Sequence, residues 1–498
     1  HSEAPLVLVE NADQLRKVEA KKSELPLLKY VVLMRGTTPE PIAGGPTVLG
    51  WDDFLARGDV TPESDVLARI DGIVPNGQAT LIYTSGTTGP PKAVELTHEN
   101  LSWTASMLRD ATNIEEGGRG LSYLPLSHIA EQMATIHGPI TGGSATYFAE
   151  SLDPQKLVQN LGEVRPTLFF GVPRIWEKFH ANIAGKMSQA KGGKARLVSW
   201  ARGVGTRVSA LRCKGQEPTG LLAVQYRLAD RLVFSTVKKA LGLDQATTLI
   251  SGAAPIGKDV IDFLASIDLL VLEIYGQSEG TGPTSFNMKG RTRFGSVGVA
   301  LPGVTVKIAD DWEILVKGKN IFAGYFKDEV ATKETLDSDG WLHSGDLGQF
   351  DADGFLFITG RKKEIIITAG GKNITPKNIE AAIKESSLVA EAVVIGDRRK
   401  YLTALVWLEP EACKKWMSER SLSGEPRESP EVRAEVQKAI DAANDKLARV
   451  EQIKKFALPS RALTIETGEL TPTLKIKRSK VSAHFQKDID AMYEGDKE

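Results

Sequence analysis

The chain has 498 residues, of which 41% are hydrophobic and 25% charged, and its 62 Lys plus Arg nearly balance 63 Asp plus Glu. This composition excludes a disordered or fibrous chain, and the length corresponds to roughly three compact units at about 150 residues each. Its two cysteines, Cys213 and Cys413, form no C-x-x-C pair, which argues against a disulfide framework, a zinc ribbon and an iron-sulfur cluster and fits a reducing compartment.

Short apolar runs alternate with helix-forming segments over the first part of the chain. The runs predict strands at residues 6–9, 30–34, 80–83, 93–96, 167–170, 248–250 and 269–275. Helices are expected at residues 12–23, near 51–57, and from about Thr97 with Asn100. Alternating strands and helices predict a layered α/β domain.

After Gly303 the pattern changes to short β-rich pieces. Strands are expected at residues 304–308 and 313–316, and the Asp353-Gly354 pair predicts a hairpin between residues 349–350 and 355–359. A charged junction at residues 360–364 follows. Beyond it we expect a strand at 365–368, a turn at Gly370-Gly371, a helix at 376–386, a strand at 392–395 and a long polar helix at 430–449. We place the domain boundary at Lys363, which gives a large domain of residues 1–362 and a small α+β domain of residues 363–498.

Charge is unevenly distributed. Residues 174–239 contain fourteen basic side chains against three acidic ones. Such a segment can attract an anionic lipid or a polyphosphate, and it can equally be a solvated helical face. No apolar run reaches the ~18 to 20 residues of a membrane span; the longest, residues 263–275, is interrupted by Asp268 and Glu273.

The loop at residues 84–92, TSGTTGPPK, carries the strongest chemical pattern. Its glycines permit close backbone approach, its hydroxyls donate hydrogen bonds, and Lys92 adds a positive charge, so the loop suits a polyphosphate. It lies between two extended segments and contains two prolines. It is therefore not the loop of a P-loop kinase, which leads from G-x-x-x-x-G-K-[ST] into a helix.

This loop resembles the phosphate loop of the adenylate-forming superfamily, and the other motifs of that family follow in order. They are LPLSH at 124–128, SGAAP at 251–255, YGQSE at 275–279, WLHSGDLG at 341–348 and GELTPTLKIKR at 468–478. The resemblance implies a large layered domain, made of two α/β subdomains and a β-barrel-like part, with a small mobile α+β C-terminal domain. It also implies the cofactor Mg²⁺ and the co-substrates ATP and coenzyme A.

The resemblance assigns a nucleotide site. Its members are Thr84, Ser85, Gly86, Thr87, Thr88, Gly89, Lys92, Gly252, Ala253, Tyr275, Gly276, Ser278, Asp346 and Arg361. Tyr275 would stack on adenine, Ser278 would contact the α-phosphate, and Asp346 and Arg361 would bind the ribose. Glu279, with Thr84, would hold Mg²⁺, for which a carboxylate is a suitable ligand. Taken alone, Glu279 fits a helix N-terminal acid better than a metal ligand, and a turn cap is the alternative role for Asp346.

The resemblance also assigns the chemistry. Lys475 would bridge the substrate carboxylate and the α-phosphate, where a cation offsets the repulsion of two anions. Lys477 and Lys480 are nearby rivals, and Leu474 stands where the family more often has glycine. His128 would lie near the carboxylate. The small domain would rotate about Lys363 and bring the Gly370-Gly371 loop to the pantetheine tunnel of coenzyme A.

The segment at 171–178, GVPRIWEK, and the basic stretch after it resemble long-chain fatty acyl-CoA synthetases, including the bubblegum type. The expected activity is an AMP-forming long-chain fatty acid-CoA ligase. The expected location is cytoplasmic, with peripheral contact of residues 174–239 with the inner membrane surface and no nucleic-acid partner. Two alternatives stay open: a fatty acyl-AMP ligase that serves a carrier protein, and a non-catalytic fatty-acid binding or transport protein.

Two features depart from the family. The chain begins at His1, and relatives carry on the order of a hundred further residues before the phosphate loop, so we expect it to start within a longer gene product. In addition, Trp312 stands where relatives usually have glycine in an Asp-Gly-Glu turn.

Overall fold

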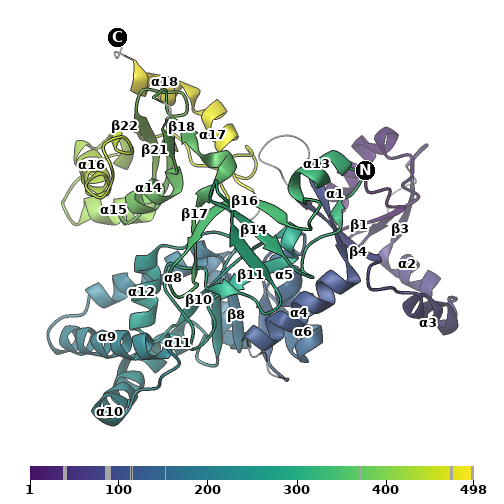
Figure 1. The fold of residues 1–498 in the computed structure, drawn as a ribbon, viewed down its shortest axis with the longest axis horizontal. Helices are drawn as coiled ribbons and strands as arrows, with labels where there is room; N and C mark the ends of the chain where they lie inside the picture. Colours follow the sequence, from purple (N-terminus) through teal and green to yellow (C-terminus); the bar gives the residue numbers. More distant parts are fainter. Residues whose placement is uncertain are drawn as a thin grey trace. The chain divides into compact units, whose positions relative to one another are not determined.

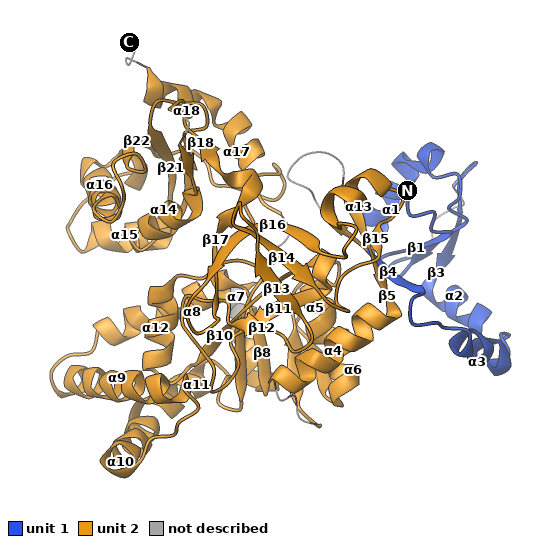
Figure 2. Ribbon diagram, viewed as in Figure 1, with its two compact units in different colours: residues 1–81 blue, residues 82–498 orange. Residues whose placement is uncertain are grey.

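The computed structural model describes residues 1–37, 42–84, 91–112, 114, 116–151, 153–370, 372–471 and 475–494. It divides into two compact units, His1–Leu81 and Ile82–Glu498 (Figure 2). The boundary that we predict at Lys363 falls within the second unit and stays a prediction.

The first unit contains a parallel three-stranded sheet, in the order β1 (Leu6–Val9), β2 (Tyr30–Leu33) and β3 (Thr47–Gly50). Its helices are α1 (Ala12–Ala20), η1 (Lys22–Glu24), α2 (Trp51–Gly58) and α3 (Glu63–Asp71). Asn11 begins α1, because its side chain accepts hydrogen bonds from the backbone N–H groups of Asp13 and Gln14. The predicted strands are confirmed, while the helix expected at 12–23 ends at Ala20 and continues as a 3-10 turn.

The second unit is built on a seven-stranded sheet (Figure 1). Its order is β12 (Val299–Ala300), β11 (Gly282–Phe286), β10 (Val271–Gln277), β9 (Thr248–Ser251), β8 (Leu168–Gly171), β6 (Arg119–Ser122) and β7 (Ala145–Phe148). The strands from β10 to β7 pair in parallel, and β11 and β12 are antiparallel. This arrangement confirms the predicted α/β layer.

Helices accompany this sheet. They are α4 (His98–Thr112), α5 (Ile129–Gln132), η2 (Met133–His137), α6 (Gly138–Gly142), α7 (Pro154–Val164), α8 (Pro173–Ser188), α9 (Gly193–Arg212), α10 (Gly220–Ala229), η3 (Asp230–Phe234), α11 (Ser235–Ala240) and α12 (Lys258–Ser266). Among the described residues, no helix is both long and apolar enough to cross a bilayer.

Trp176 of α8 lies at the centre of the core between sheet and helices. Its ring is fully buried and meets Phe169 and Phe179 edge to face, at centroid distances of 5.5 and 5.8 Å. Its indole Nε1 donates to the carbonyl oxygens of Gly171 and Ile250, at 3.1 and 3.2 Å. The GVPRIWEK segment therefore joins β8, β9 and α8 through one side chain.

The β-rich part expected after Gly303 is a four-stranded antiparallel sheet, in the order β13 (Thr305–Ile308), β14 (Glu313–Lys317), β16 (Leu342–Phe350) and β17 (Leu356–Arg361). The Asp353-Gly354 turn joins β16 and β17, as predicted. Nearby lie β4 (Gln78–Thr84), β5 (Lys92–Thr97), β15 (Gly324–Tyr325) and α13 (Glu329–Thr335), and β15 pairs with β5.

Trp312 occupies the turn between β13 and β14 with a φ of 69°, and it is 61% exposed. A left-handed conformation costs a bulky residue roughly 1 to 2 kcal/mol, which glycine avoids. We expect Trp312→Gly to raise the free energy of unfolding by about 1 kcal/mol, measured by urea denaturation. Trp312→Ala is the control, because it removes the ring but keeps the β-carbon; an equal gain with alanine would contradict the backbone explanation.

The C-terminal part is an α+β fold. It contains η5 (Lys362–Glu364), β18 (Ile366–Ile367), β19 (Asn373–Ile374), α14 (Pro376–Ile383), β20 (Val389–Ile395), β21 (Leu402–Leu408), α15 (Pro410–Ser418), η6 (Pro426–Glu428), α16 (Pro430–Asn444), β22 (Ile453–Ala457), α17 (Arg478–His484) and α18 (Gln486–Tyr493). The helices predicted at 376–386 and 430–449 are shorter than expected. In α16 the reason is Asn444, whose side chain accepts from the N–H of Ile453 and donates to its carbonyl, so the chain turns into β22.

Candidate active site

A large cavity of about 3130 Å³ is lined by described residues of the second unit. Its lining comes from the ends of β9 and β10, from β16 and β17, and from the C-terminal part. Open α/β sheets bind ligands at the carboxyl ends of their parallel strands. The predicted site residues that line the cavity are Thr84, Lys92, His128, Ala253, Tyr275, Gly276, Ser278, Glu279, Asp346, Arg361, Lys363 and Lys475.

Some predicted residues cannot be placed or lie elsewhere. Ser85, Gly86, Thr87, Thr88, Gly89 and Gly371 lie outside the described residues. Gly370 is described but is not part of the cavity wall. Gly252 is buried directly behind the wall, where an added β-carbon would lie 2.5 Å from the Ile274 side chain.

Tyr275, Asp346 and Arg361 form one hydrogen-bonded group. The Tyr275 hydroxyl donates to one carboxylate oxygen of Asp346 at 2.9 Å, and Arg361 Nε lies 3.0 Å from the other. Burial and the neighbouring Asp346 charge raise the pKa of Tyr275 well above its usual range, so it stays a donor. The carboxylate is thus held in a fixed orientation in the cavity wall, as a receptor for vicinal hydroxyls requires.

Gly276 has a steric role beside this group. Strand β10 pairs with β11 through a register shift between Tyr275 and Gly276, and a β-carbon on Gly276 would lie 1.6 Å from the Gly282 carbonyl oxygen. Only glycine permits this close approach of two backbones. The bulge therefore sets where Tyr275 stands relative to Ser278 and Glu279.

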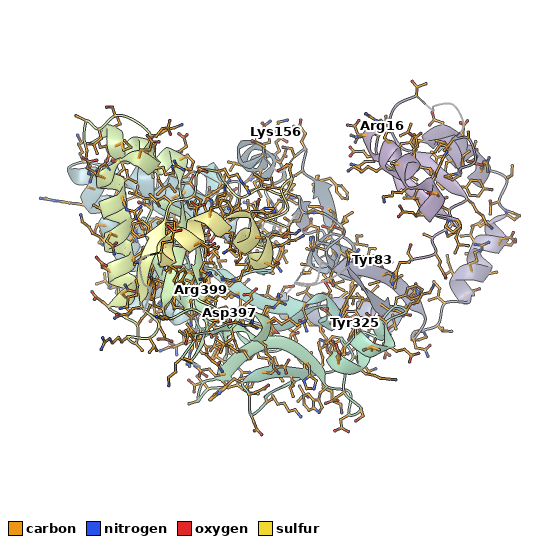
Figure 3. The ribbon with its side chains drawn as sticks, turned by 90° about the horizontal axis from the view of Figure 1, so that it is seen from above. Arg16, Tyr83, Lys156, Tyr325, Asp397 and Arg399 are labelled. Atoms are coloured by element: carbon orange, nitrogen blue, oxygen red, sulfur yellow. The ribbon has the colours of Figure 1, made fainter. Side chains whose placement is uncertain are left out.

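Tyr325 is a site residue that the sequence reasoning missed. Its hydroxyl donates to Glu279 at 2.8 Å, and the Lys92 ammonium lies 4.8 Å from the centre of its ring. Figure 3 labels Tyr325. One side chain thus contacts both the predicted metal ligand and the lysine of the phosphate loop. Nothing in the single sequence indicates this, because Tyr325 is brought beside Lys92 only by the pairing of β15 with β5.

Lys475 lies in the same cavity, close to His128. Desolvation lowers the pKa of both groups. The charge of Lys475 lowers the pKa of His128 further, and repulsion from Arg361 lowers the pKa of Lys475 further. Lys377 of α14 is a further basic residue of the wall, which the sequence reasoning missed, and burial lowers its pKa as well. The charges of Arg361 and Lys377 thus act on Lys475, and an anionic ligand beside Lys475 would relieve this local repulsion.

His128 stands at the start of α5 and is supported from behind by a buried carboxyl group. Glu131 accepts hydrogen bonds from the hydroxyls of Ser122 and Thr135, at 2.7 and 3.0 Å, and from the N–H of Tyr123 at 3.1 Å. Burial raises the pKa of Glu131 despite these donors. The first turn of α5 is thus tied to the end of β6, which fixes His128 at the rim of the sheet.

The segment that carries Lys475 is held by the buried Glu469. This carboxylate accepts from Arg461 and His484, each at 2.6 Å, and from Thr467. Burial acts to raise the pKa of Glu469, but these hydrogen bonds outweigh burial and hold it well below its usual range. A short bridge between Leu470 and Ile476 closes the segment around Lys475.

This depressed pKa predicts an acid-sensitive segment. A carboxyl whose folded-state pKa is lowered stabilises the fold above its unfolded pKa, about 4.3 for Glu, and this contribution is lost as pH falls further. We expect Glu469→Gln to unfold more readily than the parent at neutral pH, and the difference to shrink between about pH 5 and pH 3. Urea midpoints measured across this range test it. A pH-independent difference would contradict the ionic origin, and the exposed Glu466→Gln serves as the control.

The predicted hinge is exposed and lies between two ion clusters. Lys363 is part of η5, and the preceding Lys362 pairs with Asp311 and the buried Glu313, at 2.6 and 3.0 Å. The following Glu364 lies 3.8 Å from Arg478, which also pairs with Glu380. Lys362 is thus tied to the β14 side and Glu364 to the C-terminal part.

Comparison with known proteins confirms the family resemblance. Residues 1–326 match the family model "AMP-binding enzyme", and residues 363–497 match the model "AMP-binding enzyme C-terminal domain". The chain is 38% identical over 527 residues to the Xenopus laevis long-chain-fatty-acid–CoA ligase ACSBG2, covering 99% of this chain and 70% of that protein. It is 36% identical over 502 residues to the Mycobacterium tuberculosis long-chain-fatty-acid–CoA ligase FadD15, covering 99% of this chain and 80% of that protein.

Solved structures of similar fold are more distant in sequence. The adenylation domain of the Segniliparus rugosus carboxylic acid reductase, in complex with AMP and a co-purified carboxylic acid, matches with a TM-score of 0.71 and 20% identity over 99% of this chain and 75% of that one. The anthranilate CoA ligase AuaEII, in complex with anthranoyl-AMP, matches with a TM-score of 0.68 and 17% identity over 98% of this chain and 79% of that one. These matches support the fold.

Proposed function

The chain belongs to the AMP-binding enzyme family, and from this premise we propose that it is an AMP-forming long-chain fatty acid-CoA ligase. The substrate class rests on the relatives named long-chain-fatty-acid–CoA ligases, which align over nearly the whole chain. One observation carries the chemistry: a single cavity contains Lys475, the Tyr275–Asp346–Arg361 group, Lys92 and Glu279.

In the first proposed step, an oxygen of the fatty-acid carboxylate attacks the α-phosphorus of ATP, the bond to the β-phosphate oxygen breaks, and pyrophosphate leaves. Asp346 and Arg361 hold the ribose, Thr84 and Lys92 bind the phosphates, and Lys475 lies between the two anions. In the second step the sulfur of coenzyme A attacks the acyl carbon, loses its proton, and releases AMP. Prepositioned cations in a cavity supply this type of stabilisation without reorganisation.

A magnesium ion fits the residues present. Among the described residues, the Glu279 carboxylate receives one side-chain hydrogen bond, from Tyr325, and the Thr84 hydroxyl lies in the same cavity. A carboxylate and a hydroxyl, completed by phosphate oxygens and water, match the oxygen ligands of this ion. When bound, it neutralises charge on the phosphates. Glu279 and Thr84 would hold it, and Tyr325 would orient Glu279.

We also propose the remaining expectations of the family. Rotation about Lys363 would withdraw Lys475 after the first step and deliver the Gly370-Gly371 loop for the second. A cytoplasmic location is supported by the cysteines, which are both free. The fatty acyl-AMP ligase and the non-catalytic binding protein remain alternatives that one assay separates.

That assay offers a panel of carboxylic acids with ATP, Mg²⁺ and coenzyme A, and scores AMP and thioester together. We expect both products from palmitate and much less of either from acetate or benzoate. AMP or acyl-adenylate without thioester would identify an acyl-AMP ligase. Palmitate binding with neither product would identify a binding protein. A clear preference for acetate or benzoate would refute the long-chain assignment.

A further inference from the structure

The seven-stranded sheet presents different surfaces on its two sides. Side chains alternate between the two faces of a strand. On β8 and β9, Phe169 and Leu249 point to one side and pack in the buried core together with side chains of α8. Leu168, Phe170 and Ile250 alternate with them and line the cavity. The cavity therefore extends along the second face of the sheet, away from the polar group at its carboxyl edge.

Helix α4 and the helical turn η2 cover this second face. The Thr248 hydroxyl of β9 donates to the carbonyl oxygen of Thr112 in α4 at 3.2 Å, and β6 contacts η2. Side chains of both helical segments line the cavity, so this part of it has the sheet on one side and helices on the other. We call it the strand channel, and its apolar walls include Leu108, Met133, Leu168, Phe170 and Ile250.

Gly120 leaves open space in the wall of the strand channel. It lies within β6, between Thr146 of β7 and Leu168 of β8, and it lines the cavity. Among the described residues, leaving out its two chain neighbours, no heavy atom lies within 4 Å of the position that a β-carbon on Gly120 would take. Its φ is not in the left-handed region, so the backbone does not require glycine. A glycine inside a strand often marks a place where a ligand approaches closely.

Gly120 lies well inside the channel. It pairs with Leu168 at the start of β8, whereas Gly171 at the end of β8 pairs with Ser251 at the carboxyl edge of the sheet. Three strand steps of about 3.3 Å place Gly120 about 10 Å from that edge. An extended hydrocarbon chain advances about 1.25 Å per carbon, because its bonds are about 1.5 Å long and its angles are near 111°. A chain whose carboxylate lies at the edge therefore passes Gly120 at roughly its ninth carbon.

We propose that Gly120 sets the chain-length preference of the enzyme. An unbranched acyl chain lies in the strand channel, and the missing side chain at Gly120 lets its distal carbons continue past β6. The inference rests on the proposed function, because that function makes a fatty acid the occupant. A side chain at residue 120 would close the channel at this depth. Each methylene group that is denied burial lowers the affinity about fourfold, so long chains lose most.

The test replaces Gly120 with leucine or valine and measures kcat/KM for thioester formation from palmitate and from octanoate. Octanoate ends before Gly120, whereas palmitate extends beyond it. We expect the ratio of the two values, palmitate to octanoate, to fall at least about tenfold in Gly120→Leu and by a smaller factor in Gly120→Val. Both variants should fold, because strand interiors favour these residues over glycine. Far-ultraviolet circular dichroism checks folding, and Gly120→Val decides if Gly120→Leu does not fold.

Gly162→Leu is the matched control. Gly162 is exposed on α7 and is not part of the cavity wall. A β-carbon there would likewise have no heavy atom within 4 Å, among the residues that the structure describes. This variant should keep the ratio of the parent. A parent-like ratio in a folded Gly120 variant would overturn the proposal.

Calorimetric binding of palmitate and octanoate to the same proteins separates failure of this inference from failure of the proposed function. A parent that binds palmitate but forms neither adenylate nor thioester from any acid would refute the ligase function. Selective loss of palmitate binding in Gly120→Leu would still support the role of Gly120. Equal palmitate binding by the parent and Gly120→Leu, or no palmitate binding by the parent, would overturn it.

Discussion

Replacing Lys475 with alanine is expected to lower the rate of acyl-adenylate formation roughly a thousandfold. The ammonium group lies in the cavity beside His128, Arg361 and Asp346, where two anions must meet in the proposed first step. The second step starts from a formed adenylate and does not bring two anions together. We therefore expect the variant to convert supplied acyl-adenylate and coenzyme A to thioester at a rate close to that of the parent.

Pyrophosphate exchange measures the first step and thioester release from synthetic acyl-adenylate measures the second. Lys480→Ala is the matched control, because Lys480 is exposed on α17 and does not line the cavity. Retained exchange in Lys475→Ala would contradict the proposed role. Loss of exchange in Lys480→Ala alone would move that role to the neighbouring lysine.

Replacing Trp176 with alanine is expected to lower the free energy of unfolding by about 3 to 5 kcal/mol. The indole is fully buried between β8, β9 and α8, and its removal leaves both a cavity and two carbonyl oxygens without their donor. Trp176→Phe retains most of the ring volume but not the donor, and we expect it to lose about 1 to 3 kcal/mol.

Urea unfolding monitored by far-ultraviolet circular dichroism tests both values. The surface variant Trp312→Ala provides a tryptophan-loss control in the same protein. A loss below about 1 kcal/mol in Trp176→Ala would contradict the central position of this ring in the core. Equal losses in Trp176→Ala and Trp176→Phe would assign the whole effect to the missing hydrogen bonds.

The sequence was sufficient to predict elements whose ends are set locally. The strand at residues 6–9 lies between Pro5 and Glu10 and was predicted with its observed limits, and the hairpin at Asp353-Gly354 follows from its turn residues. The start of α16 at Pro430 was predicted, but its C-terminal end could not be, because Asn444 ends the helix through hydrogen bonds to Ile453, nine residues further along the chain.

In the site, too, local motifs could be recognised in the sequence, whereas residues placed by distant contacts could not. Asp346, Arg361 and Tyr275 were named from motifs, and the structure brings them together; their ligand roles stay predictions. Tyr325 and Lys377 were missed because no local pattern marks them. They reach the cavity only through the pairing of β15 with β5 and the packing of the C-terminal part.

The ion cluster of Arg478 has a mechanical consequence. Arg478 follows Lys475 by three residues and pairs with Glu380 of α14 and with Glu364, the residue directly after the proposed hinge. If the C-terminal part rotates about Lys363, these ion pairs rotate with it. The Lys475 segment then moves as a rigid body with α14 rather than as a flexible segment. The Lys475 ammonium would then leave the reaction centre in the same movement that brings the Gly370-Gly371 loop to it. Loss of the Arg478 ion pairs would uncouple these two movements.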